Sequence, residues 1–120
     1  MSDILISSFF DSVGRAGRVS IARWEPQGVG DFKRYPTLAP GAWFRSVELS
    51  EDEDRYFDQL YRLDPNQVLA DLRALAGAGA TPILCCWERR WQIEARRAWC
   101  HRHLVATWFK RELRIEVVEL

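Results

Sequence analysis

The order of the apolar segments is the feature that most constrains the fold of this chain. Two short apolar runs, at residues 4–6 and 83–86, suit buried strands. Residues 19–23 alternate with the period of a strand, and residues 115–118 form a last strand-like segment. Helical patterns lie between them, and a strand–helix–strand order favours parallel strands with a right-handed crossover. The sequence therefore predicts an α/β fold: a single three-layer, Rossmann-like domain over residues 1–120, with a small, largely parallel sheet.

Capping signals mark the helices in the middle of the chain. Ser50-Glu51-Asp52-Glu53 is a capping box, in which serine and glutamate side chains bond backbone N–H groups at a helix start. Asp64 followed by Pro65 marks a second start, and Gly77 marks its end. We expect one helix after Ser50 and another between Pro65 and Gly77. Residues 24–47 show no sustained period and are predicted to form a loop that packs onto the domain through its aromatic side chains.

A change of helical phase occurs between residues 89 and 113. One apolar stripe comprises Trp91, Ala95, Ala98 and Trp99, and a second comprises His101, Leu104, Val105, Trp108 and Phe109. The two stripes point roughly 100° apart, so one straight helix cannot bury both. We expect a new helix to begin near Cys100. Free backbone N–H groups and the helix dipole would there favour a bound anion and a thiolate.

Motifs in both halves of the chain carry a resemblance to a known family. In the C-terminal half they are Leu84-Cys85-Cys86-Trp87-Glu88 and Cys100-His101-Arg102-His103-Leu104-Val105-Ala106-Thr107-Trp108. In the N-terminal half they are Ser7-Ser8-Phe9-Phe10, Ser20-Ile21-Ala22-Arg23, Pro26, Tyr35 and Leu38-Ala39-Pro40. This is a resemblance to DUF488, a family of small proteins without a settled activity. It spans nearly the whole chain and implies a Cys-x-Glu motif after a strand and a Cys-His-Arg motif opening a helix. The interval from Glu88 to Cys100 departs from the family by being longer and richer in Arg and Trp.

These motifs predict a polar pocket for a small anionic or nucleotide-like ligand, because ligands bind at the carboxyl ends of parallel strands. Candidate catalytic residues are Cys86, Glu88, Cys100 and His101, and candidate ligand-binding residues are Arg102, Arg23 and Ser7. In an enzyme, either of these cysteines would be the nucleophile and His101 the acid or base, but the sequence does not decide whether the protein is an enzyme. The structural alternative is an internal Glu88–Arg102 salt bridge with the cysteines as small core residues.

Two other kinds of site remain as alternatives. Eight basic residues and four tryptophans between residues 87 and 114 suit single-stranded nucleic acid, with Arg89, Arg90, Arg96 and Arg97 as the contacts. The pI near 6.7 argues against this alternative. A zinc site would draw on Cys86, Cys100, His101 and His103, but adjacent Cys and His cannot easily both ligate. We therefore predict no metal and no cofactor.

Composition and charge complete the expectations. No apolar run approaches the roughly 20 residues needed to span a membrane, and the first residues lack a secretion signal. With three cysteines, an odd number, we expect free thiols in a reducing cytoplasm. Residues 48–64 are strongly acidic and residues 89–114 strongly basic. These segments either steer an anionic partner, lie solvated, or face each other within the fold. The oligomeric state is not predicted.

Overall fold

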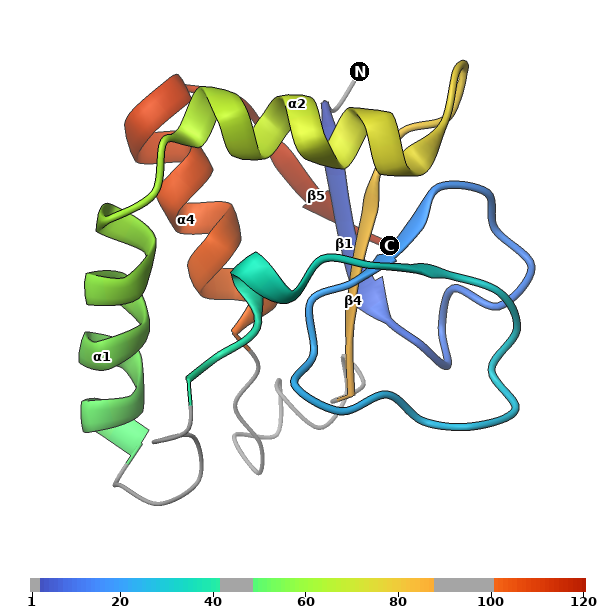
Figure 1. Cartoon of the computed structure of the whole chain (residues 1–120), viewed down its shortest axis with the longest axis horizontal. Helices are drawn as coiled ribbons and strands as arrows, with labels where there is room; N and C mark the ends of the chain where they lie inside the picture. Colours follow the sequence, from blue (N-terminus) through green and yellow to red (C-terminus); the bar gives the residue numbers. More distant parts are fainter. Residues whose placement is uncertain (1–2, 42–48, 88–100) are drawn as a thin grey trace.

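The computed structural model describes residues 3–41, 49–87 and 101–120. Within these residues, five strands form one parallel sheet in the order β3-β2-β4-β1-β5 (Figure 1). The strands are β1 (Ile4–Ser8), β2 (Arg18–Ser20), β3 (Lys33–Arg34), β4 (Ile83–Cys86) and β5 (Val117–Glu119). The predicted α/β fold with a small parallel sheet is confirmed, and its arrangement is Rossmann-like.

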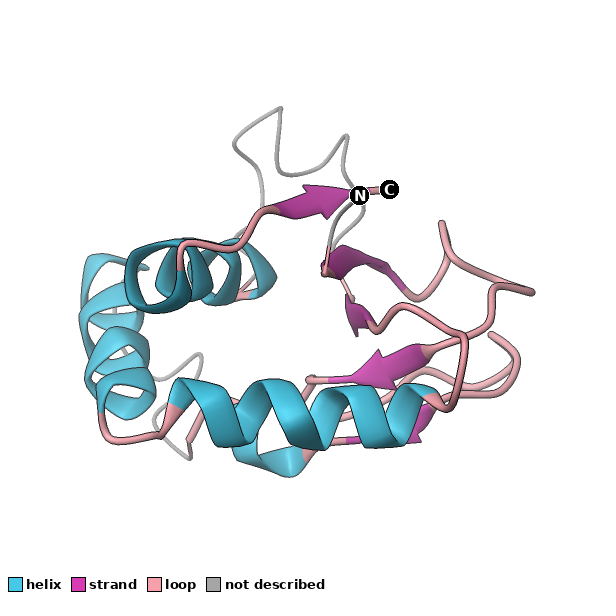
Figure 2. Cartoon of the chain, turned by 90° about the horizontal axis from the view of Figure 1, so that it is seen from above, coloured by secondary structure: helices cyan, strands magenta, loops and turns pink. Residues whose placement is uncertain are grey.

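The described helices gather on one face of the sheet (Figure 2). They are α1 (Leu49–Tyr61), α2 (Pro65–Ala76) and α4 (Arg102–Leu113). Both α2 and α4 contact strands directly, and α1 packs on α4. The opposite face is covered by loops, since Phe9, Val29 and Phe32 pack there on Ile83 and Cys85. Helices, sheet and loops are therefore three layers.

The sheet separates two hydrophobic cores, one beneath the helices and one beneath the loops, and successive residues of a strand alternate between them. On β4, Leu84 joins the core beneath the helices, whereas Ile83 and Cys85 join the core beneath the loops. The same period places Val19 of β2, and Ile21 just after it, on the helix side. Successive side chains of a strand point to opposite faces, so this alternation follows directly from the sequence.

A buried arginine ties the loop layer to the sheet. Arg18 of β2 donates from Nη2 to the Phe9 carbonyl oxygen (2.7 Å) and from Nη1 to those of Val29 (2.6 Å) and Asp31 (3.1 Å). Its Nε donates to Ser12 Oγ at 3.1 Å. One side chain thus connects the β1–β2 loop and the β2–β3 loop, and the guanidinium supplies the fork of donors that this requires.

The helix boundaries agree with the capping signals to within two residues. The Asp64 carboxylate accepts from the Asn66 backbone N–H at 3.0 Å, and Gly77 ends α2 with a φ of 91°. The capping box predicts a helix that begins after Ser50. Helix α1 instead begins at Leu49, so Ser50 lies in its first turn. A new helix, α4, begins at Arg102, two residues after the predicted start. The last strand, β5, begins two residues after the start of the predicted segment 115–118.

Residues 24–41 contain two elements that the sequence did not reveal. Strand β3 pairs with β2, and a short 3₁₀ helix, η1 (Pro36–Leu38), follows it. Both residues of β3 are charged and exposed, so no apolar period marks the strand. The Tyr56 hydroxyl of α1 donates to the Leu38 carbonyl oxygen at 2.6 Å and fixes η1 on the core.

The acidic and basic segments face each other where the structure describes them. Helix α1 packs on α4, and Arg111 of α4 donates to the Tyr61 hydroxyl of α1 at 3.1 Å. The Arg111 guanidinium also lies 5.5 Å from the centre of the Phe57 ring. Arg111 of the basic segment is therefore held by aromatic side chains of the acidic segment. Among the described helices, none has the length and apolarity to cross a membrane.

Candidate functional site

Cys86 and Arg102 are the two predicted site residues that the structure brings into direct contact. Cys86 ends β4 and Arg102 begins α4, on the helix side of the sheet. Arg102 Nη1 donates to Cys86 Sγ at 3.3 Å. The predicted meeting of a strand end and a fresh helix start is therefore present.

Arg102 is engaged mainly by a carboxylate that the sequence did not single out. Its Nε and Nη2 donate to Glu119 Oε1 at 2.9 and 2.5 Å, and the other carboxylate oxygen pairs with His103 Nε2 at 3.1 Å. Burial raises the pKa of Glu119, but the hydrogen bonds from Arg102 and His103 outweigh it, so its pKa lies below its ordinary value. Because the Arg102 guanidinium is fully buried, it stabilises the junction of α4 and β5 and is not presented to a ligand.

His101 is buried directly before α4, where it contacts α1 and the segment that follows β2. Its Nε2–H donates to the Ile21 carbonyl oxygen at 2.6 Å, just after β2, and its ring meets Tyr56 of α1 edge-on at 5.2 Å. Burial, together with the smaller effect of the nearby Arg102 cation, lowers the pKa of His101 to about 4, although the hydrogen bond to Ile21 acts in the opposite direction. A neutral, enclosed imidazole is suited to holding α4 against β2, and less suited to the acid–base role inferred from the sequence.

The cysteines differ from the expectation of free thiols. Cys85 is a free, buried thiol on the loop side, and burial raises its pKa despite contacts with Ser12 and Arg18. Cys86 is disulfide-bonded, so the expectation is wrong for this residue. The strand period explains the difference, because it turns Cys86 to the helix side and away from Cys85. Cys100 lies outside the described residues.

The residues predicted to contact nucleic acid fall mostly outside the described part of the chain. Glu88 and the arginines proposed for nucleic acid, Arg89, Arg90, Arg96 and Arg97, lie outside the described residues. Of the tryptophans in that alternative, Trp87 is exposed, whereas Trp108 is fully buried in the core and cannot stack on a base. Among residues 3–41, 49–87 and 101–120, no group of three or more His, Cys, Asp or Glu side chains could hold a metal ion.

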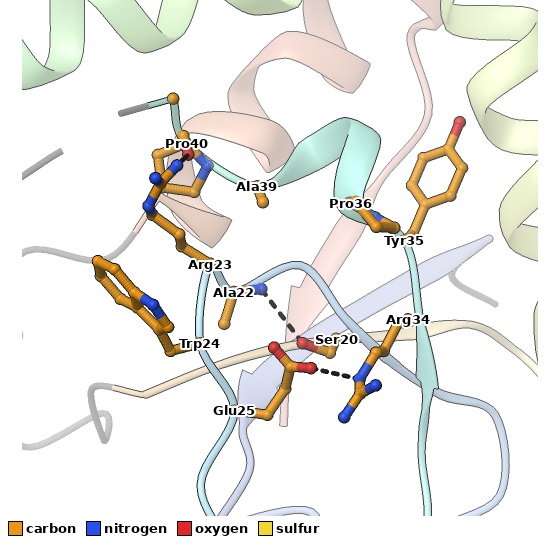
Figure 3. A pocket seen from close by; sticks show the side chains of 11 residues that line it. Ser20, Ala22, Arg23, Trp24, Glu25, Arg34, Tyr35, Pro36, Ala39 and Pro40 are labelled. Carbon is orange, nitrogen blue, oxygen red and sulfur yellow. Dashed lines mark hydrogen bonds and ion pairs between the residues drawn. The ribbon is translucent and has the colours of Figure 1, made fainter. Parts of the chain in front are cut away.

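A pocket of about 520 Å³, here called the edge pocket, opens at the carboxyl ends of β2 and β3 (Figure 3). Its polar and charged lining comes from Ser20, Arg23, Glu25 and Arg34. The remaining walls are formed by Ala22, Trp24, Tyr35, Pro36, Ala39, Pro40 and Gly41. The short strands β2 and β3 therefore position this pocket, because Ser20 ends β2, Arg34 ends β3, and both residues line it.

The charges of the edge pocket are only partly neutralised. Arg34 Nε pairs with Glu25, yet the Arg34 side chain is 70% exposed and the Glu25 side chain 14%. Arg23 Nη1 donates to the Pro40 carbonyl oxygen at 3.4 Å. The Ser20 hydroxyl accepts from the Ala22 N–H at 3.3 Å. Two arginines against one carboxylate leave the described lining with an excess of positive charge.

Tyr35 is a wall of the edge pocket that points its hydroxyl elsewhere. The hydroxyl donates to Asp71 of α2 at 2.7 Å. Burial and the hydrogen bond to Asp71 raise the pKa of Tyr35 to about 12. In Figure 3 the ring turns away from Arg34 and Glu25. Tyr35 therefore forms part of the wall, and the arginines are the side chains available to bind a polar ligand.

The three predicted ligand-binding residues do not share one pocket. Arg23 lines the edge pocket, and Arg102 is absent from that lining. Ser7 pairs with Cys85 in the sheet and is buried, and its Oγ has no hydrogen-bond partner in the described structure. Arg34, Glu25 and Trp24 were not predicted, since a two-residue charged strand and an aperiodic loop give no pattern to read.

Comparison of the chain with family models, with curated proteins and with solved structures finds no match. The resemblance to DUF488 therefore stays a prediction, and the assignment of a function depends on the edge pocket and the residues around it.

Proposed function

We propose that the protein binds a small organic anion, such as a phosphate ester, in the edge pocket. The position at the carboxyl ends of parallel strands supports this, because ligands of open α/β sheets bind there. The volume lies within the range of small-molecule sites. Arginine presents a planar fork of donors that matches phosphate and carboxylate oxygens.

The exposed guanidinium of Arg34 is the observation that carries this proposal. Arg102, the arginine that the sequence favoured, is buried and bonded to Glu119. Arg34 keeps most of its side chain accessible beside the pocket, and Arg23 adds a second cation. An incoming anion would therefore meet Arg34 first and would compete with Glu25 for it.

We expect Arg34→Ala to weaken the binding of ribose 5-phosphate at least tenfold, because the variant loses a charge-assisted contact to the anion. Isothermal titration calorimetry at fixed ionic strength measures this affinity. Arg73→Ala is the matched control, since Arg73 is an exposed arginine paired with Asp3 and does not line the edge pocket. Equal losses in both variants, or no binding by the native protein, would contradict the proposal.

We expect Glu25→Gln to strengthen the binding of ribose 5-phosphate about three- to tenfold. The variant removes the carboxylate that competes with the ligand for Arg34. The gain should vanish when Arg34→Ala is also present, and a double-mutant cycle tests that dependence. Weaker binding by Glu25→Gln would instead show that the carboxylate holds Arg34 in its working position.

A further inference from the structure

An indole ring forms an unusually exposed wall of the edge pocket. Trp24 is 58% exposed although it is a large apolar side chain. It lies in the same lining as Arg34 and Arg23 (Figure 3). Exposed aromatic side chains with adjacent cations suit ligands that combine a flat ring with a negative charge.

One contact to the ring of Trp24 and one to its backbone restrict this residue. The Arg23 guanidinium lies 5.2 Å from the centre of its indole ring, and Arg23 is itself bonded to Pro40. The Trp24 carbonyl oxygen accepts a hydrogen bond from the indole N–H of Trp87. Because the Arg23 contact already restricts the ring, less conformational entropy is lost when a ligand stacks on it.

We infer that the edge pocket takes a nucleobase, stacked on Trp24, next to a phosphate held by Arg34; the inference rests on the proposed function. The apolar walls of Ala22, Pro36 and Ala39 can cover the rest of a base, while the arginines meet its phosphate. The arginine–indole contact extends naturally to a third flat group, because guanidinium, indole and base all offer planar faces.

The stacking surface continues beyond the pocket along the same edge of the sheet. Phe10 follows β1 and Trp87 follows β4, and they are 40% and 39% exposed. Their rings meet edge-on at 6.2 Å. Strands β2, β4 and β1 are neighbours in the sheet, so Trp24, Trp87 and Phe10 follow three adjacent strand ends. The nucleotide can therefore be free or part of a single strand, and both share a base beside a phosphate.

The test compares adenosine monophosphate with ribose 5-phosphate, which carries the same charge but no base. We expect calorimetry to show at least fivefold tighter binding of the nucleotide to the native protein. The ratio of the two affinities should fall towards one in Trp24→Ala and persist in Trp24→Phe, which keeps an aromatic ring. Trp24→Leu separates stacking from general apolar contact, and a thermal unfolding curve checks that each variant is folded.

Equal affinities of the two ligands for the native protein, or a ratio unchanged in Trp24→Ala, would overturn this inference. The proposed function would still hold after that result if Arg34→Ala weakened the binding of both ligands. It would fail separately if neither ligand bound the native protein.

A hexamer of deoxyadenylate identifies the source of the nucleotide. If the hexamer binds more tightly than adenosine monophosphate, and Trp87→Ala reduces its affinity, the result supports the inference with a nucleic-acid strand as the source. Binding no tighter than adenosine monophosphate supports it with a free nucleotide.

Discussion

Replacing Arg18 with methionine is expected to lower the free energy of unfolding by about 4 kcal/mol. Arg18 is almost fully buried, and its guanidinium donates to Ser12 Oγ and to three backbone carbonyl oxygens from two loops. Methionine fills much of the same space but donates no hydrogen bond, so buried acceptors are left unsatisfied at roughly 1–3 kcal/mol each. Urea unfolding followed by circular dichroism measures the change.

Two variants make the Arg18 result interpretable. Arg15→Met alters an exposed arginine of the same β1–β2 loop and should change stability by less than about 0.5 kcal/mol. Arg18→Lys keeps the charge but not the fork of donors, so an intermediate loss is expected. An Arg18→Met protein within about 1 kcal/mol of the native one would show that the loop layer is not held by this side chain.

Lowering the pH from 7 to 5 is expected to destabilise the native protein by about 2 kcal/mol through His101 alone. Burial lowers the pKa of His101 from 6.5 to about 4 in the folded chain. The unfolded state then binds more protons between these two values, so stability is full above about pH 6.5 and is lost as the pH falls towards 4. One unit of pKa difference corresponds to about 1.4 kcal/mol.

The matched variant for this prediction is His101→Gln. Its side-chain amide can still donate to the Ile21 carbonyl oxygen but does not titrate. The variant should therefore lose much of the dependence between pH 7 and pH 5. The pKa of Glu119 lies below its ordinary value of 4.5, so that carboxylate loses its contribution only at lower pH. An unchanged pH dependence in His101→Gln would contradict the assignment.

The parts of the fold that could be predicted are those with a local signal. Helix α2 is bounded by Asp64, Pro65 and Gly77, whose backbone preferences act within a few residues. Strand β4 is a continuous apolar run because both of its faces are buried. Strand β3 has no such signal, since it is short, charged and at the edge of the sheet, where only the pairing with β2 defines it.

The site was harder to predict because tertiary contacts decide it. The sequence showed that Arg102 would lie near the end of β4, and the structure agrees. Nothing local indicated that Glu119 would neutralise it, because that contact depends on the register of β5 against β1 and on the packing of α4. Arg23 was singled out, but its neighbours Trp24, Glu25 and Arg34 come together only when the chain turns back after β2 and β3.

The most direct test of the edge pocket as the ligand site is a titration of ¹⁵N-labelled protein with adenosine monophosphate, followed by amide chemical shifts. The account predicts that the largest shifts cluster in residues 20–25 and 34–41, the two segments that contain the lining of the pocket. It also predicts that the same titration of Arg34→Ala gives small shifts throughout. Largest shifts at residues 101–107 instead, around the buried Arg102 and the start of α4, would contradict it.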